Sequence, residues 1–406
     1  MNKRSVDLGL FTVTIALLVI GIFMVFDASY ARAGQMKLTG NDSLYFMKRQ
    51  ALFAIVGLGM MFLGMRVPYQ KLRKVSLGVL VVSIIGLALV FVPGLGVTVN
   101  GATRWIKCPG FQFQPSELAK LGLVLYMASY LTVKGREIRD LRRGFVPALI
   151  PLIPIGALVM LEPDMGTTIV LMLTALAMIG VAGAHKRHVI AILLLGLVVG
   201  SALILTSNYR KERVMSFRDP FADYYGSGYQ VSQSLIALGS GGPLGVGLCE
   251  SREKLFYLPA EHTDFIFAVL GEEAGLKGTL LVTGLFLLFG ARGFKIAGQT
   301  KDSFGRLVAA GISIMISGQA LLNMCVVTSS VPATGVPLPF ISYGGSSLAL
   351  NLLCAGILLG ISKYGSTSVM VEEKSTRAAR TKSRKSRSAS HGSRVGARPD
   401  QITRHL

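Results

Sequence analysis

The chain has 406 residues, of which 51% are hydrophobic and only 16% charged, and its formal net charge is +21. A soluble domain carries about 25% charged residues, so this composition disfavours a soluble protein and indicates a membrane protein. The positive charge alone would suggest nucleic-acid binding. No recognition motif accompanies it, and we expect no nucleic-acid partner.

Apolar runs of about 17–25 residues recur along the chain, and this length crosses a bilayer as an α-helix. The runs do not alternate apolar and polar positions as the strands of a transmembrane barrel do. We therefore expect an all-α polytopic membrane protein, because helices satisfy their own backbone in lipid. The ten expected spans are 8–28, 48–65, 75–93, 116–133, 145–161, 165–183, 188–205, 264–291, 307–327 and 346–362.

Lys and Arg gather on alternate connections between these spans, and basic connections are typical of the cytoplasmic side. The basic segments are 3–4, 66–74, 134–143, 186–187 and 292–306. Both termini are therefore expected in the cytoplasm, with the long connection 206–263 outside. The first apolar run exceeds the core of a signal peptide, about 7–15 residues, so we expect a retained anchor.

Residues 1–363 are expected to form one membrane domain, and 364–406 a disordered cytoplasmic tail. The tail is rich in Lys, Arg and Ser and cannot bury enough apolar surface to fold. Contact with anionic membrane lipids is the favoured interpretation, and docking of a partner is the alternative. Cys108 and Cys249 both fall on the expected outer side, where they form either a disulfide or two unrelated thiols.

Charged residues lie at the outer ends of the fourth and neighbouring spans. Glu117 and Lys120 share one helix face at a spacing of three. They serve either catalysis or mutual neutralisation. Arg104 and Trp105 precede them. Trp105 is either an interfacial anchor or, with Arg104, part of an anion site.

Asp164 follows Pro163 between the fifth and sixth spans, where it either caps the next helix or contacts substrate. Asp264 opens the eighth span. A carboxylate is costly at a membrane boundary and is a functional candidate by default. His262 either orients Asp264 or caps the loop, and Asp264 itself could be only a helix cap. In a helical bundle these groups can converge on one outward-facing cavity.

The segment after Asp264 contains Glu272, Glu273 and Lys277, which is unusually polar for lipid. We expect a helix that is long, tilted or broken there and that lines a water-filled cavity. A structural charge cluster of these three residues is favoured over a catalytic one.

The long connection 206–263 exceeds about 12–15 residues, a length that usually indicates function or disorder. Arg210 and Arg213 lie near its start, and Gln233 lies in a short amphipathic helix expected at 229–238. The glycine-rich stretch 239–247 is either a flexible turn or a place where backbone amides approach phosphate.

The connection 328–345 contains no Lys or Arg and is restricted by prolines. After Ser342 and Tyr343 it loosens through its glycines, including Gly344, and serines cap the tenth span. Small residues would let the backbone approach a bulky ligand, and the alternative is a re-entrant turn packed in protein.

Taken together, these motifs resemble the SEDS family (shape, elongation, division and sporulation), whose branches include FtsW, RodA and SpoVE. The resemblance runs in order through nearly the whole membrane domain. The matching segments are 100–106, 113–120, 163–167, the motif around 233–239, 258–267, 271–273 and 337–347.

The resemblance implies a peptidoglycan glycosyltransferase that polymerises lipid II at the outer face of the bacterial plasma membrane. It further implies a class B penicillin-binding protein as partner, within the divisome or elongasome. The family's essential aspartate falls on Asp264. Segment 100–106 and the basic tail favour the FtsW-like division type, whereas 336–339 is closer to the elongation type.

In this reaction a sugar hydroxyl needs a general base, and the diphosphate leaving group needs positive charge. Direct displacement would invert the anomeric centre. A divalent cation such as Mg²⁺ or Mn²⁺, held by Asp264 and diphosphate oxygens, competes with the base assignment. The expected catalytic residues are Asp264, Glu117 and Lys120, and the expected substrate-binding residues are Arg104, Trp105, Asp164, Arg210, Arg213, Gln233, His262, Ser342, Tyr343 and Gly344.

Two other function classes fit ten spans with charges near the membrane. A lipid II flippase would need a path across both leaflets, yet the candidate groups gather at the outer side, which favours an enzyme. A scaffold would require that Asp264 be dispensable.

Overall fold

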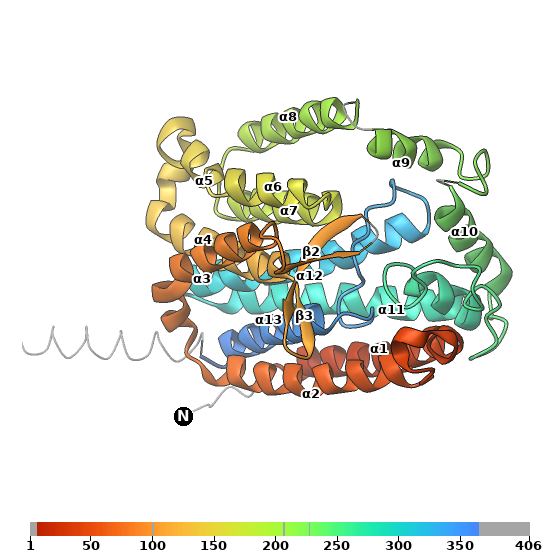
Figure 1. Ribbon diagram of the computed structural model, residues 1–406. Helices are drawn as coiled ribbons and strands as arrows, with labels where there is room; N and C mark the ends of the chain where they lie inside the picture. The colour runs from red at the N-terminus through yellow and green to blue at the C-terminus, as the bar shows by residue number, and fades with distance from the viewer. Residues whose placement is uncertain (1–5, 100, 206–207, 227, 365–406) are drawn as a thin grey trace, which may run out of the picture.

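The computed structural model describes residues 6–99, 101–205, 208–226 and 228–364, so nearly all of the expected tail lies outside the described part. Its helices form one bundle (Figure 1). The helices are α1 (Leu8–Gln35), α2 (Tyr45–Arg66), α3 (Tyr69–Leu89), α4 (Pro115–Lys134), α5 (Val146–Leu149), α6 (Leu152–Leu161), α7 (Met165–Val181), α8 (Lys186–Leu205), α9 (Asn208–Arg218), α10 (Tyr229–Gly241), α11 (Ile266–Gln299), α12 (Ser303–Val327) and α13 (Gly345–Tyr364), with short turns at Lys37–Thr39, Gly135–Arg139 and Leu141–Phe145.

Helix covers most of each expected span, and seven segments of the described part are long and apolar enough to cross a membrane. The fold class, an all-α polytopic membrane protein, is thereby confirmed. The number of crossings and the cytoplasmic placement of both termini stay predictions. The fifth expected span is assembled from a turn, α5 and α6, because Pro147 and Pro151 interrupt regular helix.

The most buried helices, α12 and α13, lie at the centre of the bundle. Helix α13 packs along α2, α11 packs against α12 and α1, and α12 also contacts α4 and α7. In Figure 1 α8 lies along the upper edge and α1 and α2 along the lower edge. Glycines bring α2 and α13 close, since a Cβ on Gly356 would collide with the Met61 carbonyl.

A small antiparallel sheet connects α3 to α4, which the sequence did not lead us to expect. Its strands are β1 (Gly96–Val99), β2 (Ala102–Cys108) and β3 (Phe111–Phe113). Val97 pairs with Trp105 and Thr98 with Thr103, which leaves Arg104 as an extra residue on β2. A bulge of this kind turns a side chain away from its regular direction. The sheet therefore determines where Arg104 points.

Helix α11 is broken at Gly275, whose φ of 63° and ψ of −159° are non-helical. The segment after α10 pairs with the backbone groups that the break leaves free. Val246 N–H donates to the Glu272 carbonyl over 3.0 Å, and Leu276 N–H donates to the Gly242 carbonyl over 2.9 Å. The broken helix was among the expectations and is confirmed. The glycine-rich stretch therefore binds the broken part of α11 through backbone hydrogen bonds.

We predict that Gly245→Ala destabilises the protein by about 1–3 kcal/mol. Gly245 has a φ of 83°, and a Cβ there would collide with the Glu273 carbonyl. The measurement is the thermal unfolding midpoint of the purified protein. Gly239→Ala is the matched control, because Gly239 is helical with open space around it, so alanine should be neutral or stabilising. Equal midpoints for the two variants would contradict the docking role.

Candidate active site

Asp264 lies two residues before α11, at the end of the long connection. Its main-chain carbonyl accepts a 2.8 Å hydrogen bond from Nδ2 of Asn323 on α12. Its carboxylate lies beside Gly335, whose φ of 73° favours glycine. A Cβ at Gly335 would lie 3.5 Å from Asp264 Oδ2 and 3.9 Å from Arg104 Nη1. The missing side chain thus leaves space between an acid and a cation.

Arg104 is held in place by the turn between α6 and α7. Its Nε donates to the Glu162 carbonyl over 3.1 Å, and its Nη2 donates to the Pro163 carbonyl over 2.5 Å. Two of the three guanidinium nitrogens are therefore used for orientation, and Nη1 is directed at Gly335. Trp105 lies on β2 opposite Val97 and is half-buried. Its role as anchor or substrate contact stays a prediction.

Asp164 caps α7. One carboxylate oxygen accepts from the Thr167 N–H over 3.0 Å, and the other accepts from the Thr167 hydroxyl over 2.9 Å. The side chain is buried. Its negative charge raises the pKa of Asp264, so the cap also contributes to the electrostatics of the site.

Glu162 is a buried acid next to this cap. Neither of its carboxyl oxygens has a hydrogen-bond partner among the described residues. Burial, together with the charge of Asp164, raises the pKa of Glu162 to about 8, although Arg104 opposes the shift. At neutral pH this side chain is therefore predominantly a neutral acid.

The pKa of Asp264 is raised to about 6, chiefly by burial. The positive charge of Arg104 lowers it, Asp164 raises it, and Arg213 and His262 lower it. An acid with this pKa is mostly ionised at pH 7 and can accept a proton there. Three of the expected site residues besides Asp264 and Arg104 therefore act on the same carboxylate.

The start of the long connection reaches the same region. Arg213 on α9 donates from Nη1 to the Ala333 carbonyl over 2.7 Å, two residues before Gly335. Arg210 also belongs to α9, but its side chain lies outside the described part of the structure.

Residues 338–344 are joined to the segment that carries Asp264. The Ser342 hydroxyl accepts from the Leu338 N–H over 2.8 Å and donates to the Thr263 carbonyl over 2.6 Å. Tyr343 N–H donates to the His262 carbonyl over 2.9 Å. Gly344 N–H donates to Gln50 on α2 over 3.4 Å. These internal bonds favour the interpretation as a packed re-entrant turn.

His262 and Tyr343 also pack with an aromatic side chain of α2. The ring centroids of Phe46 and His262 lie 4.5 Å apart, and those of Phe46 and Tyr343 lie 5.0 Å apart. Nδ1 of His262 lies 3.4 Å from Glu261, which pairs with Arg32 of α1 over 2.8 Å. His262 thus anchors the loop next to Asp264.

Glu117 and Lys120 form a buried ion pair of 2.9 Å on α4. Lys120 also donates to Oε1 of Gln319 over 2.6 Å, and Gln319 donates to the Pro337 carbonyl over 2.9 Å. The pair therefore reaches the Asp264 region through α12. A direct part in catalysis stays a prediction for both residues.

Gln233 lies on α10 and donates to the Tyr224 hydroxyl over 3.2 Å. The next residue, Ser234, donates to the Val327 carbonyl over 2.7 Å. Helix α10 is thereby attached to the C-terminal end of α12. Gln233 thus contacts another residue of the long connection, Tyr224. Its contact with substrate stays a prediction.

The charge cluster expected on α11 has a different cation. Lys254, from the long connection, lies 2.6 Å from both Asp27 of α1 and Glu273. Glu272 accepts from the Arg252 N–H over 2.8 Å. The expected member Lys277 is exposed, because it follows the break at Gly275. The expected cluster of Glu272, Glu273 and Lys277 is therefore wrong in its cation, because Lys254 of the long connection takes the place of Lys277.

Several residues of the region escaped sequence reasoning, namely Gln50, Gly335, Gln319 and Asn323. Gln319 and Asn323 carried a usable signal, because two carboxamides four residues apart in an apolar span share one helix face.

Cys108 and Cys249 are both free thiols, which agrees with the alternative of two unrelated thiols.

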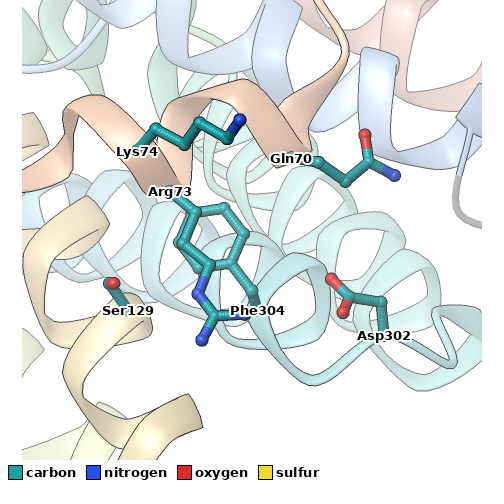
Figure 2. Close-up of a pocket in the computed structure, with 6 residues that line it drawn as sticks. All are labelled: Gln70, Arg73, Lys74, Ser129, Asp302 and Phe304. Atoms are coloured by element: carbon teal, nitrogen blue, oxygen red, sulfur yellow. The ribbon is translucent and has the colours of Figure 1, made fainter.

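A pocket of about 480 Å³ lies near the opposite end of α4 from Glu117 (Figure 2). It is lined by Gln70, Arg73, Lys74, Ser129, Asp302 and Phe304. The Asp302 carboxylate caps α12 by accepting from the Gly305 N–H over 2.8 Å. In Figure 2 the Arg73 and Lys74 side chains point apart, so they do not form one anion site.

Comparison with known proteins identifies the family. The sequence model of the FtsW/RodA/SpoVE family, described as a cell cycle protein, matches residues 8–367. This chain belongs to the FtsW/RodA/SpoVE family. It is 44% identical over 363 residues to stage V sporulation protein E of Bacillus subtilis, covering 89% of this chain and 98% of that protein. The resemblance to SEDS proteins is confirmed.

Three further proteins bear on activity and fold. A probable peptidoglycan glycosyltransferase FtsW of Geobacter sulfurreducens is 40% identical over 88% of this chain and 95% of its own length. A chain of a solved peptidoglycan synthase complex that coordinates polymerization and crosslinking is 28% identical, with a TM-score of 0.74, over 89% of this chain and 98% of that one. The rod shape determining protein RodA of Thermus thermophilus is 27% identical, with a TM-score of 0.65, over 90% and 99%.

We predict that Glu162→Gln removes a pH-dependent loss of stability. The folded chain keeps the proton on Glu162 up to a pKa of about 8, whereas the unfolded chain releases it near 4.5. Wild-type stability therefore falls as pH rises between these values, by an amount on the order of a few kcal/mol. The thermal midpoint of the variant, relative to that of wild type, should therefore be higher at pH 8 than at pH 4.5. A constant difference across this range would show that Glu162 is ionised in the folded protein.

Proposed function

We propose that this protein is a peptidoglycan glycosyltransferase that polymerises lipid II at the outer face of the bacterial plasma membrane. The observation that carries the proposal is the Asp264 carboxylate, with its raised pKa, facing Arg104 across Gly335. The names of the FtsW relatives support the same activity.

Asp264 acts as the general base. It takes the proton of the acceptor sugar's 4-hydroxyl while that oxygen bonds to the anomeric carbon of the donor. The bond from this carbon to the diphosphate breaks, and the diphosphate leaves with the electron pair. The displacement inverts the anomeric centre, from an α-linked donor to a β-linked product. A pKa of about 6 leaves Asp264 ionised enough to begin this step at neutral pH.

The leaving diphosphate needs positive charge that is already in place. Arg104 Nη1, directed at Gly335, is the nearest cation to the proposed reaction site. Arg213, attached at Ala333, supplies the second. Lys120 donates to Glu117 and Gln319, so it acts on the site indirectly, by holding the Gln319 side chain that binds the Pro337 carbonyl.

A divalent cation is the alternative role for Asp264. The described residues contain no group of three His, Cys, Asp or Glu side chains that could hold a metal ion. In this alternative Asp264 would be the protein ligand, and the substrate diphosphate would supply the remaining oxygens. Mg²⁺ or Mn²⁺ would have to arrive with the substrate diphosphate.

Partner and setting follow from the same relatives. Similarity to a chain of a synthase complex that couples polymerization to crosslinking supports a class B penicillin-binding protein as partner, within the divisome or elongasome. FtsW and SpoVE relatives at 40–44% identity support a division or sporulation role over a RodA-like one. No contact among the described residues favours the flippase alternative.

We predict that Asp264→Asn abolishes glycan polymerisation while leaving folding intact, because the amide cannot accept the hydroxyl proton. The measurement is polymer formed from lipid II by the purified full chain with its cognate transpeptidase. Asp219→Asn is the matched control, since Asp219 lies exposed in the same long connection and only caps a turn. Wild-type polymerisation by Asp264→Asn would refute the base assignment.

Excess cation separates the two roles of Asp264. We expect that raising Mg²⁺ or Mn²⁺ after EDTA treatment will not restore Asp264→Asn, because a missing base is not replaced by a metal. An asparagine oxygen still binds a divalent cation weakly. Recovery of polymerisation at high cation concentration would therefore assign the carboxylate to metal binding.

A further inference from the structure

Helix α12 presents two buried carboxamides toward the Asp264 region. Gln319 and Asn323 lie one turn apart and are each 1% exposed. Buried amides in an apolar span are costly unless their donors and acceptors are used. The question is what these two side chains hold.

Asn323 holds two segments at once. Its Nδ2 donates one hydrogen bond of 2.8 Å to the Asp264 carbonyl and another of 2.8 Å to the Val336 carbonyl. Two carbonyl acceptors can be satisfied only by the amide nitrogen, which determines the orientation of the side chain. The buried Oδ1 has no partner among the described residues, so the two donated bonds are what hold Asn323 in this orientation. The connection before α11 is therefore joined to segment 334–337 by one side chain.

Gln319 holds the next carbonyl along the same segment. It donates to Pro337 over 2.9 Å and accepts from Lys120 over 2.6 Å, and Lys120 in turn pairs with Glu117. The carbonyls of residues 336 and 337 are thus both bound to α12. Gly335, which faces the Asp264 carboxylate, immediately precedes them.

We propose that Asn323 is a positioning residue for sugar transfer, which fixes the Asp264 main chain against the Gly335 segment. Gln319, supported by the Glu117–Lys120 pair, fixes the neighbouring carbonyl. The inference rests on the proposed function, because it assumes that Asp264 is the base. It also gives Lys120 a purpose that needs no contact with substrate.

Position controls rate here because the base must lie within hydrogen-bond reach of the attacking hydroxyl, and a misplacement of about 1 Å can cost about a hundredfold. Asn323→Leu keeps the size of the side chain and removes both donors. The two carbonyls then lack their partner, and the Asp264 segment can shift toward water. We expect kcat to fall at least tenfold while KM for lipid II changes less than threefold.

The pH profile supplies a readout that loss of stability alone would not move. Burial holds the pKa of Asp264 at about 6, so wild-type activity should fall as pH drops through about 6. A better hydrated carboxylate in Asn323→Leu returns toward the ordinary value of 3.8. The acid limb of kcat/KM should therefore shift to lower pH.

The experiment uses the full chain in lipid nanodiscs with its cognate transpeptidase and purified lipid II. Asn351→Leu is the matched control, because Asn351 is also buried, in α13, and its side-chain amide donates to Ser347 over 3.2 Å rather than to a segment near Asp264. Thermal midpoints of both variants are measured in parallel. The proposal expects a similar loss of stability in both and a change of kcat and pH profile in Asn323→Leu alone.

Each outcome decides the proposal. Wild-type kcat and an unmoved acid limb in Asn323→Leu would overturn it, as would equal kinetic losses in the two variants. If Asn323→Leu is too unstable to assay, Asn323→Ser, which can retain one donor, must show a lower kcat than wild type and an acid limb shifted to lower pH, and wild-type values for both would overturn the proposal. Activity in Asp264→Asn would refute the base, whereas an inactive Asp264→Asn with a normal Asn323→Leu refutes only the positioning.

Discussion

Backbone carbonyls in two irregular segments, 258–265 and 334–344, need donors inside a helical bundle that offers little water. A buried carbonyl without a donor costs about 1–3 kcal/mol. Asn323 satisfies one carbonyl from each segment, and Gln319 satisfies a third. The break in α11 is resolved in the same manner, by backbone groups of 242–247. At these positions near Asp264, irregular chain is supported by hydrogen bonds from another element.

The same packing determines the charge state of the site. Burial raises the pKa of both Asp264 and Glu162, and the positive charge of Arg104 opposes the shift for each. The shift leaves Asp264 at about 6 and Glu162 at about 8. One acid is thus available as a base near neutral pH while its neighbour stays protonated. If Asp264 and Glu162 were both ionised beside Asp164, three negative charges would gather around the single guanidinium of Arg104.

The sequence predicted the helices well, because apolar length and helix hydrogen bonding leave few alternatives in lipid. It also placed Arg104 and Asp164 with Asp264 because they lie at outer span ends, His262 because it is two residues away in the chain, and Arg213 because the leaving group needs positive charge. It did not predict the sheet of residues 96–113, whose strands are too short to show a pattern. The exchange of Lys277 for Lys254 depended on the Gly275 break, which periodicity alone cannot locate. Roles in substrate binding depend on a ligand pose that sequence does not contain.

The buried Glu117–Lys120 pair is better understood as a geometric device than as a source of stability. Desolvation of two charges can exceed their attraction, so such a pair often contributes little net stability. Here the ammonium has a second acceptor in Gln319, whose amide then has only its nitrogen to offer the Pro337 carbonyl. A neutral pair in place of Glu117 and Lys120 would leave that amide free to rotate. The buried ion pair thereby fixes one orientation of Gln319 and, through it, of the segment that faces Asp264.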